Sequence, residues 1–376
     1  MRRRRYLAPW QREDLPLEVG GLDGWDELSA EALVALRGKP AIYHCISRVV
    51  NREFVFGAEE KEHFVHLMRL YERFCRVRIL SFVVMSNHFH LLLEVPARPQ
   101  KEMSDEQLLK HLSCLYSTAQ VKQVRWELEH YRDLGAEEAA EALREKYLCR
   151  MYDLSAYMKI VKQRFTQWFN KKHARKGTLW EDRFKSTLVE DGHAARVVAA
   201  YLDLNPVRAG LVRDPKDYRW CGYGEAVAGK KAAREGLQRV LFEKFSTVSS
   251  EKLAAKRVAS WARLSREYRT MLFLDGRAPQ PEKEGGTRRK GVRTFTEKQV
   301  RKVLESGGKL SEVEMLHCRA RYVADGMVFG TKGFLNHTFR LSRTWFSAGR
   351  KDGARKIRAV DTELCTMRDL QVRPLG

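Results

Sequence analysis

The chain has 376 residues, which is more than one hydrophobic core usually holds, so we expect two or three domains. Its hydrophobic fraction of 44% is ordinary for a globular protein and excludes a wholly disordered chain. Lys and Arg number 70 against 48 Asp and Glu, which gives a formal net charge of +22. This excess predicts attraction to a polyanion, either nucleic acid or an anionic membrane surface.

Membrane insertion and secretion are both disfavoured by the sequence. No apolar run is long enough to cross a bilayer, and the arginines at positions 2–5 are not followed by the apolar stretch of a signal peptide. The seven cysteines are widely spaced and contain no CxxC, so neither a disulfide framework nor a cysteine zinc site fits. We therefore expect a cytoplasmic protein with no membrane partner.

The chain divides into three parts by composition. Residues 1–39 form a basic arm with a short helical pattern around Trp25–Leu36, ended by the Gly38-Lys39-Pro40 break. Residues 40–245 predict an α+β domain. Residues 246–376 differ from this domain in composition and are strongly basic.

Within the α+β domain, runs of β-branched and aromatic residues predict strands, and apolar residues at helical spacing predict helices. The expected strands are 41–50, 78–85, 88–95 and 187–190, and the expected helices are 59–76, 155–172 and 194–204. Residues 97–150 are rich in Glu, Lys, Gln and Ala and predict a helical insertion. The helix at 194–204 should end at Asn205, because the residue before a proline avoids the α region.

The last part predicts a basic helical domain after a linker at Gly276–Gly291. Helical patterns cover 295–305, 312–323 and 332–341, and the last two, separated by a Gly turn, suggest a helix-turn-helix. From Ser246 onward there are 28 Lys and Arg against 14 Asp and Glu, a net charge of +14. That charge favours auxiliary DNA binding over a small helical domain with a solvated tail.

A His-x-His pair is the most informative motif. His88 and His90 lie on one expected strand, and the period of two places both side chains on the same face. Two imidazoles side by side form half of a divalent metal site. Alone, such a pair is more often structural or solvent-exposed. Glu94 shares the parity of the histidines and is a weaker candidate ligand, because a glutamate at a strand end is usually solvated.

A tyrosine and an asparagine four residues apart form the second motif. Tyr201 and Asn205 fall on one face of the expected helix at 194–204. A phenol and a carboxamide together can supply a nucleophile and an oxygen ligand. For an isolated motif of this kind, packing of the tyrosine and capping by the asparagine are the commoner roles.

These motifs occur in an order that resembles a known family, the REP-associated tyrosine transposases, which are HUH endonucleases with a single tyrosine. The resemblance runs from Ala41 to Tyr223. It rests on Tyr43-His-Cys-Ile-Ser-Arg48, Ser86-Asn-His-Phe-His90, Gly177-Thr-Leu-Trp-Glu-Asp-Arg-Phe-Lys-Ser186, Tyr201 through Asn205-Pro-Val-Arg-Ala-Gly210, and Asp217-Tyr-Arg-Trp220. Two departures are the long insertion 97–150 and Phe165, where many relatives have tyrosine.

The resemblance implies an α+β fold of the HUH type, with an antiparallel sheet and helices on one side of it. It also implies a metal-dependent transposase that cleaves and transfers single-stranded DNA at hairpin-forming repeats. His88, His90 and Asn205 would hold Mg²⁺ or Mn²⁺, and Tyr201 would attack the scissile phosphate to give a 5′-phosphotyrosine. Because a phenol is mostly protonated at neutral pH, the metal or a nearby base would have to help it ionise.

Basic residues near these motifs are the candidate DNA-binding groups. Arg183 and Lys185 flank the aromatic Phe184, and Arg208 follows the helix of Tyr201. Cations combined with aromatic rings are the usual means of holding a single strand. The expected partner is single-stranded or hairpin DNA, bound by a monomer or homodimer associated with the bacterial nucleoid. Two alternatives stay open: a non-catalytic nucleic-acid-binding protein, and a metal-dependent RNA-processing enzyme in which Tyr201 only packs.

Overall fold

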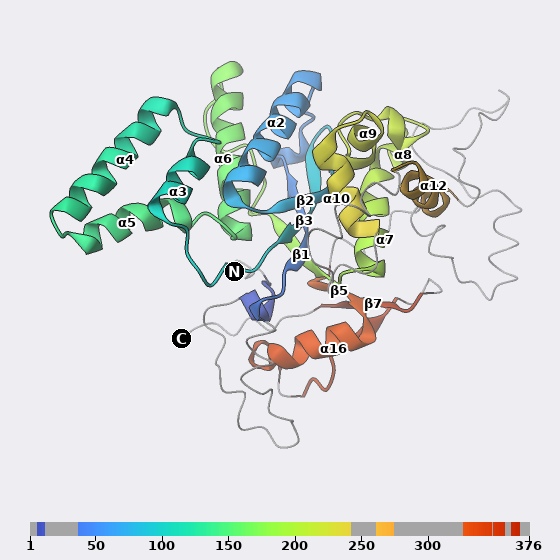
Figure 1. The fold of residues 1–376 in the computed structure, drawn as a ribbon. Helices are drawn as coiled ribbons and strands as arrows, with labels where there is room; N and C mark the ends of the chain where they lie inside the picture. The colour runs from blue at the N-terminus through green and yellow to red at the C-terminus, as the bar shows by residue number, and fades with distance from the viewer. Residues whose placement is uncertain are drawn as a thin grey trace, which may run out of the picture.

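A seven-stranded sheet runs through the protein, in the order β2-β3-β1-β4-β5-β7-β6 (Figure 1). The computed structural model describes residues 6–11, 37–241, 261–273, 326–347, 349–357 and 362–368. The predicted helices around Trp25–Leu36, at 295–305 and at 312–323, and the linker Gly276–Gly291, lie outside these residues. Within the described part, no helix is both long and apolar enough to cross a membrane.

The N-terminal half of the sheet is antiparallel, as expected. Strand β1 (Ala41–Arg48) pairs with β3 (His88–Val95) on one side and β4 (Lys185–Val189) on the other. Strand β2 (Arg78–Val84) pairs with β3 and forms the edge. The predicted α+β class is therefore confirmed.

Two long helices cover one face of the sheet. Helices α2 (Ala58–Cys75) and α6 (Leu154–Lys172) pack against the odd-numbered residues of β1. Tyr43 and Cys45 are fully buried there, together with Phe64 of α2 and Phe165 of α6. Phe165 therefore fills a core position.

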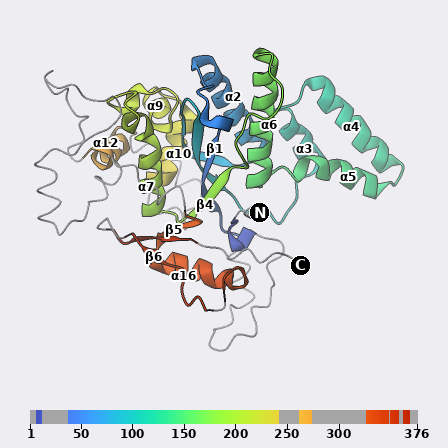
Figure 2. The same cartoon turned by 180° about the vertical axis from the view of Figure 1, so that it is seen from behind.

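Helices also cover the opposite face, so the prediction of helices on one side only is wrong. This second layer contains α7 (His193–Asp203), α8 (Asn205–Arg208), α9 (Gly222–Val227), α10 (Lys231–Leu241) and α12 (Trp261–Leu272). The reason is that the strands are apolar on both faces, as Ile42 and Leu92 show on the α7 side. Figures 1 and 2 show the two helical layers from opposite sides.

The chain does not leave the helical conformation at Asn205. Helix α7 ends at Asp203, and after Leu204 the short helix α8 begins at Asn205. Pro206 lies in the first turn of α8, where the missing N–H of proline has no intrahelical partner to lose.

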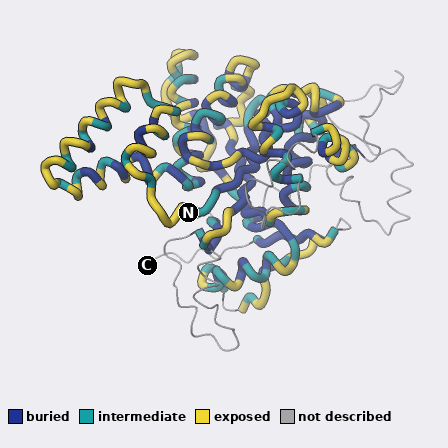
Figure 3. The backbone as a smooth tube through the Cα atoms, in the orientation of Figure 1, coloured by how far each residue is buried: buried dark blue, intermediate teal, exposed yellow. Residues whose placement is uncertain are grey.

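The insertion forms a helical arm that projects from the α2 and α6 side of the molecule (Figures 1 and 2). It consists of α3 (Asp105–Leu112), α4 (Thr118–Asp133) and α5 (Glu137–Leu148), which confirms its predicted helical character. Ser104 and Ser117 begin α3 and α4 with capping boxes. Most of the outer surface of α4 is exposed (Figure 3).

The C-terminal residues add strands to the same sheet. Strand β5 (Val328–Thr331) pairs in parallel with β4, and β7 (Leu364–Met367) joins β5 to β6 (Arg355–Lys356). Helix α16 (Lys332–Leu341) coincides with the predicted helix. The prediction of a wholly helical C-terminal domain is therefore wrong for the described residues. The strands were missed because they are too short for a period of two to be recognised in the sequence. The turn at Gly326 leads into β5 rather than directly into α16.

Deletion of residues 326–376 is expected to destabilise the domain that contains the histidines. Val328 and Phe329 are fully buried, and Glu190 accepts hydrogen bonds from the backbone N–H and hydroxyl of Thr331. Each large apolar side chain that loses its burial costs about 1.5–3 kcal/mol. Thermal denaturation should show a clearly lower midpoint for the deleted protein, and an unchanged midpoint would show that β5 contributes little.

Candidate active site

Three histidines lie on the α7 face of the sheet. In the register of β1 and β3, Arg48 is opposite His88, Ile46 is opposite His90, and His44 is opposite Leu92. Paired residues on neighbouring strands point to the same side, so His44 joins the predicted pair His88 and His90. The ring centroids of His88 and His90 are 5.1 Å apart.

His90 is buried and held by His44. Its Nδ1 lies 2.9 Å from Nε2 of His44, and the two rings stack with centroids 5.2 Å apart. Burial places the pKa of His90 well below its usual value, and the nearby charges of His88, His44, Arg208 and Arg48 lower it further. His90 is therefore neutral at physiological pH, which is the form that binds a metal ion.

His88 is half-buried and is oriented by the residue before it. Its Nδ1 lies 2.7 Å from Oδ1 of Asn87, and the side-chain amide of Asn87 donates a hydrogen bond to the carbonyl of Arg52 at 2.9 Å. An amide oxygen can only accept, so His88 donates its Nδ1–H to Asn87. This bond directs Nε2 of His88 away from Asn87.

Tyr201 projects from α7 next to these histidines. Its ring centroid lies 6.4 Å from that of His44 and 6.3 Å from that of His90. The side chain is nearly buried, with 7% exposure. The structure thus places Tyr201, His88 and His90 on the same face of the sheet.

Asn205 and Arg208 both lie against the helical turn of Tyr201. Nδ2 of Asn205 donates to the carbonyl of Tyr201 at 3.3 Å, and Nη2 of Arg208 donates to the same carbonyl at 2.7 Å. The guanidinium of Arg208 lies 4.1 Å from the Tyr201 ring centroid. Because Nδ2 of Asn205 makes this hydrogen bond, Oδ1 is the atom of the Asn205 amide that can act as a metal ligand.

A buried carboxylate holds helix α7 in place. Asp203 is fully buried and accepts hydrogen bonds from Ser81 of β2, the backbone N–H of Tyr223 and the hydroxyl of Tyr268. The Tyr268 bond is 2.6 Å long and connects α12 to α7. Asp203 therefore determines where the helix of Tyr201 lies on the sheet.

Asp203 should make stability depend on pH. Burial raises its pKa from 3.8 to about 6, while its hydrogen bonds oppose the rise. Between about pH 4 and pH 6 the folded state binds this proton and the unfolded state does not, so the contribution of Asp203 to stability falls as pH rises. We expect a decline of at most about 3 kcal/mol over this window, which Asp203→Asn should remove in denaturation curves. An identical pH profile for the variant would contradict this role.

The three predicted DNA-binding residues differ in position. Arg208 contacts Tyr201, as described above. Lys185 is exposed at the start of β4 and is paired with Ile46, so its side chain points to the same face as His90. Arg183 is exposed in the loop before β4. Arg48, opposite His88, is a further exposed cation on this face.

Glu94 lies at the far end of β3 and is not placed as a ligand. Its carboxylate forms ion pairs with Arg78 at 2.8 Å and with Arg239 at 2.7 Å. The side chain is 4% exposed, so the expectation of a solvated glutamate is wrong as well. These ion pairs explain how a carboxylate is tolerated there.

The histidines and Asn205 would fit a divalent cation only in combination with ligands from outside the protein. In the described residues, no group of three or more His, Cys, Asp or Glu side chains is arranged as a metal site. The candidate donor atoms are Nε2 of His88, Nε2 of His90 and Oδ1 of Asn205. Both histidines use Nδ1 for another contact, which is the usual arrangement of metal-binding histidines. The residues present therefore fit such an ion if water and a substrate oxygen complete its shell.

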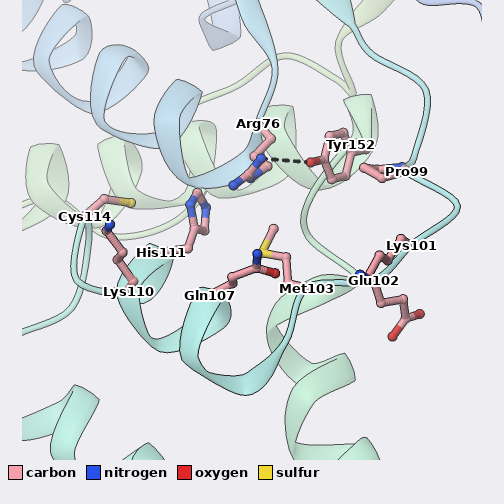
Figure 4. A pocket seen from close by; sticks show the side chains of 10 residues that line it. All are labelled: Arg76, Pro99, Lys101, Glu102, Met103, Gln107, Lys110, His111, Cys114 and Tyr152. Carbon is pink, nitrogen blue, oxygen red and sulfur yellow. Dashed lines mark hydrogen bonds between the residues drawn. The ribbon is translucent and has the colours of Figure 1, made fainter.

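A cavity of about 590 Å³ lies on the other side of the sheet, between the C-terminal end of α2 and α3 of the insertion (Figure 4). Arg76, His111 and Tyr152 line it, and Nη1 of Arg76 donates to the hydroxyl of Tyr152 at 3.2 Å. Neither His88, His90 nor Tyr201 borders this cavity. It is separate from the candidate active site.

The fold and this face define an α+β protein that brings two strand histidines beside a helical tyrosine. Residues 39–130 match the family model described as "Transposase IS200 like". For this segment, the match confirms the resemblance to single-tyrosine transposases. It includes His44, His88 and His90 and ends before Tyr201.

One solved structure that is similar to this chain is described as "Structure of the REP associates tyrosine transposase bound to a REP hairpin". The two sequences are 15% identical, the alignment covers 56% of this chain and 89% of that chain, and the TM-score is 0.33. Comparison with curated proteins gave no match.

Proposed function

We propose that the protein is a metal-dependent endonuclease and strand transferase that acts on single-stranded DNA through a 5′-phosphotyrosine. The observation that carries the proposal is the position of Tyr201, whose ring lies 6.3 Å from that of His90 on the face that His88 shares. A nucleophile beside a paired imidazole site is the arrangement that such chemistry needs. The match of residues 39–130 to IS200-like transposases supports the same class of reaction.

His88, His90 and Asn205 would hold Mg²⁺ or Mn²⁺ through Nε2 of each histidine and Oδ1 of the asparagine. When bound, the ion would polarise the scissile phosphate as a Lewis acid. The low pKa of His90 keeps this residue neutral and able to coordinate. His44 and Asn87 fix the ring orientations of the two histidines.

Tyr201 would act as the nucleophile in a transesterification. Its phenolic oxygen forms a bond to phosphorus while the bond from phosphorus to the 3′-oxygen breaks, and that oxygen leaves as a free 3′-hydroxyl. The phenolic proton is transferred away from Tyr201, and the 3′-oxygen gains one. The covalent intermediate conserves the bond energy, so the reverse attack by a 3′-hydroxyl rejoins DNA without ATP.

Basic side chains would stabilise the phosphate during this step. Arg208 places its guanidinium 4.1 Å from the Tyr201 ring centroid, and it would contact the phosphate that Tyr201 attacks. Arg48 and Lys185 are exposed on the same face and would contact neighbouring phosphates. Residues 246–376, with a net charge of +14, would add further DNA contacts.

The reaction should be detectable as a covalent protein–DNA adduct. A hairpin oligonucleotide with single-stranded flanks and a 3′ label would be incubated with the full chain and Mn²⁺ or Mg²⁺, then separated under denaturing conditions. A 5′-phosphotyrosine joins the 3′ part of the DNA to the protein, so the 3′ label should migrate with the protein and a 5′ label should not. Binding without any adduct would favour a non-catalytic binder. RNA cleavage that survives Tyr201→Phe would favour an RNA-processing enzyme.

Asn87→Ala should weaken cation binding without unfolding the protein. Loss of the Asn87 oxygen removes the acceptor that orients His88, and such orienting bonds typically contribute 10–100-fold to metal affinity. Titration with Mn²⁺, followed by electron paramagnetic resonance, would measure the change. Asn170→Ala is the matched control, because Asn170 lies on α6 and donates to the carbonyl of Gly177. Equal Mn²⁺ affinity in both variants would contradict the role of Asn87.

A further inference from the structure

The loop between β1 and α2 is held in a strained conformation. Asn51 and Arg52 both have positive φ angles, 55° and 58°, which are uncommon for residues other than glycine. Backbone hydrogen bonds fix the loop at both ends: Val50 N–H donates to the carbonyl of Leu179 at 3.0 Å, and Phe56 N–H donates to that of Ser86 at 3.0 Å. Such strain persists only where the surroundings determine the conformation.

This loop exposes Phe54 while it buries Phe56. Phe56 is 2% exposed and stacks on Phe165, with ring centroids 5.0 Å apart. Phe54, two residues earlier, is 82% exposed, the highest value for a large apolar side chain in the described part of the chain. Its ring is nearly all in water, so packing within the fold does not account for a phenylalanine at this position.

Phe54 lies in the loop that follows β1, at the end of the sheet where β3 begins with His88. Asn87 connects the two directly: its amide nitrogen donates to the carbonyl of Arg52, and its amide oxygen contacts Nδ1 of His88. The backbone N–H of Val49 also donates to the carbonyl of Asn87 at 2.9 Å. The loop therefore has a fixed position relative to His88.

Two exposed arginines precede this ring in the chain. Arg48 precedes the loop opposite His88, Arg52 lies two residues before Phe54, and both are exposed. Glu53, between Arg52 and Phe54, is acidic and accepts a hydrogen bond from Asn51. An exposed aromatic ring combined with nearby arginines is the combination with which proteins hold single-stranded nucleic acid, the ring stacking on a base and the cations contacting phosphates.

We propose that Phe54 is a stacking platform for one unpaired base of the DNA strand, next to the phosphate that the histidine face receives. This inference rests on the proposed function, because it takes single-stranded DNA as the ligand of that face. The stack would place the strand relative to His88 through the fixed loop. Phe54 is thus a positioning residue for substrate, with no part in bond making or breaking.

The test uses binding rather than cleavage, so it is separate from the chemistry of Tyr201. Full-length Tyr201→Phe protein would be titrated, without divalent metal, into hairpin oligonucleotides that carry 2-aminopurine at successive positions of the single-stranded flank. Stacking on an aromatic ring should quench the probe at one or two adjacent positions. Phe54→Ala, added to this protein, should remove that quench and weaken binding about tenfold, as expected for the loss of one base–aromatic stack.

Three further variants separate stacking from other roles of the ring. Phe54→Trp should keep the quench, whereas Phe54→Leu, which is apolar but not aromatic, should lose it. Trp126→Ala is the matched control, since Trp126 is a 58% exposed aromatic on α4 of the insertion arm, and this change should leave the quench and the affinity unaltered. Melting midpoints should be the same for all of them.

Several results would overturn the proposal. One is an undiminished quench in Phe54→Ala, and another is a quench in Phe54→Leu equal to that of the parent. A third is loss of self-association by Phe54→Ala with unchanged DNA binding, which would mean that the ring contacts a second copy of this chain. A wild-type protein that forms no adduct, but shows a Phe54-dependent quench, would contradict the proposed function and leave the stacking role intact.

Discussion

Tyr201→Phe should abolish the covalent protein–DNA adduct and leave the protein folded. The substitution removes one oxygen and little volume from a ring that packs beside His44 and His90. We expect stability to change by about 1 kcal/mol or less, the usual contribution of one hydroxyl hydrogen bond. The adduct should fall below detection, because phenylalanine has no atom that can bond to phosphorus. Labelled DNA on denaturing gels and a thermal melt of the same sample measure both quantities.

The matched control for this change is Tyr152→Phe. Tyr152 is half-buried, and its hydroxyl accepts a hydrogen bond from Arg76 on the opposite side of the sheet. The Tyr152→Phe variant should form the adduct at the normal yield. A normal yield from Tyr201→Phe, or a loss in Tyr152→Phe, would mean that the nucleophile is assigned to the wrong residue.

His88→Ala should abolish cleavage while much of the DNA affinity remains. His88 is half-buried at the start of β3, so its removal leaves the core intact, whereas His90 is buried against His44 and is less suitable for this test. The change removes one of the two imidazole ligands, and the cation would then be held too weakly to polarise the phosphate. Cleavage and filter-binding assays on the same oligonucleotide separate the two effects.

The control for His88→Ala is His66→Ala, because His66 is an exposed histidine on α2. The His66→Ala variant should cleave the oligonucleotide at the normal rate. Full cleavage by His88→Ala in the presence of excess EDTA would show that no divalent ion at this face takes part in the reaction.

Local patterns in the sequence predicted the elements that carry the site. The limits of β3 agree with the predicted strand His88–Val95 because the Ser86-Asn87 turn precedes it and Pro96 follows it. The period of two then gave the common face of His88 and His90 without knowledge of any partner strand. The spacing of Tyr201 and Asn205 similarly predicted that they share one helical face. Although Tyr201 lies on α7 and Asn205 begins α8, the side-chain amide of Asn205 does reach the Tyr201 carbonyl.

Features that depend on pairing between distant segments could not be predicted in this way. His44 was part of a recognised motif, but its contact with His90 depends on the register of β1 against β3. The bond between Asp203 and Tyr268 joins helices 65 residues apart, and nothing local to either residue indicates it. The second helical layer could have been predicted, because the strands are apolar on both faces and each apolar face needs a cover. The prediction of helices on one side only overlooked this pattern.

The C-terminal strands were missed for a related reason. Val328–Thr331 and Leu364–Met367 are four residues each, which is too short for a period of two to be distinguished from chance. Their strand conformation is stabilised by pairing with β4 and with each other. The helix Lys332–Leu341 between them has three turns of amphipathic sequence, and it was predicted correctly.

Peptide mapping of the trapped protein–DNA adduct tests the central proposal most directly. The wild-type chain would be reacted with the hairpin oligonucleotide, digested with a nuclease and a protease, and analysed by mass spectrometry. The nucleotide remnant should be found on the peptide that contains Tyr201. A remnant on Tyr157, which is fully buried on the opposite face of the sheet, or on any other residue would contradict the proposed mechanism.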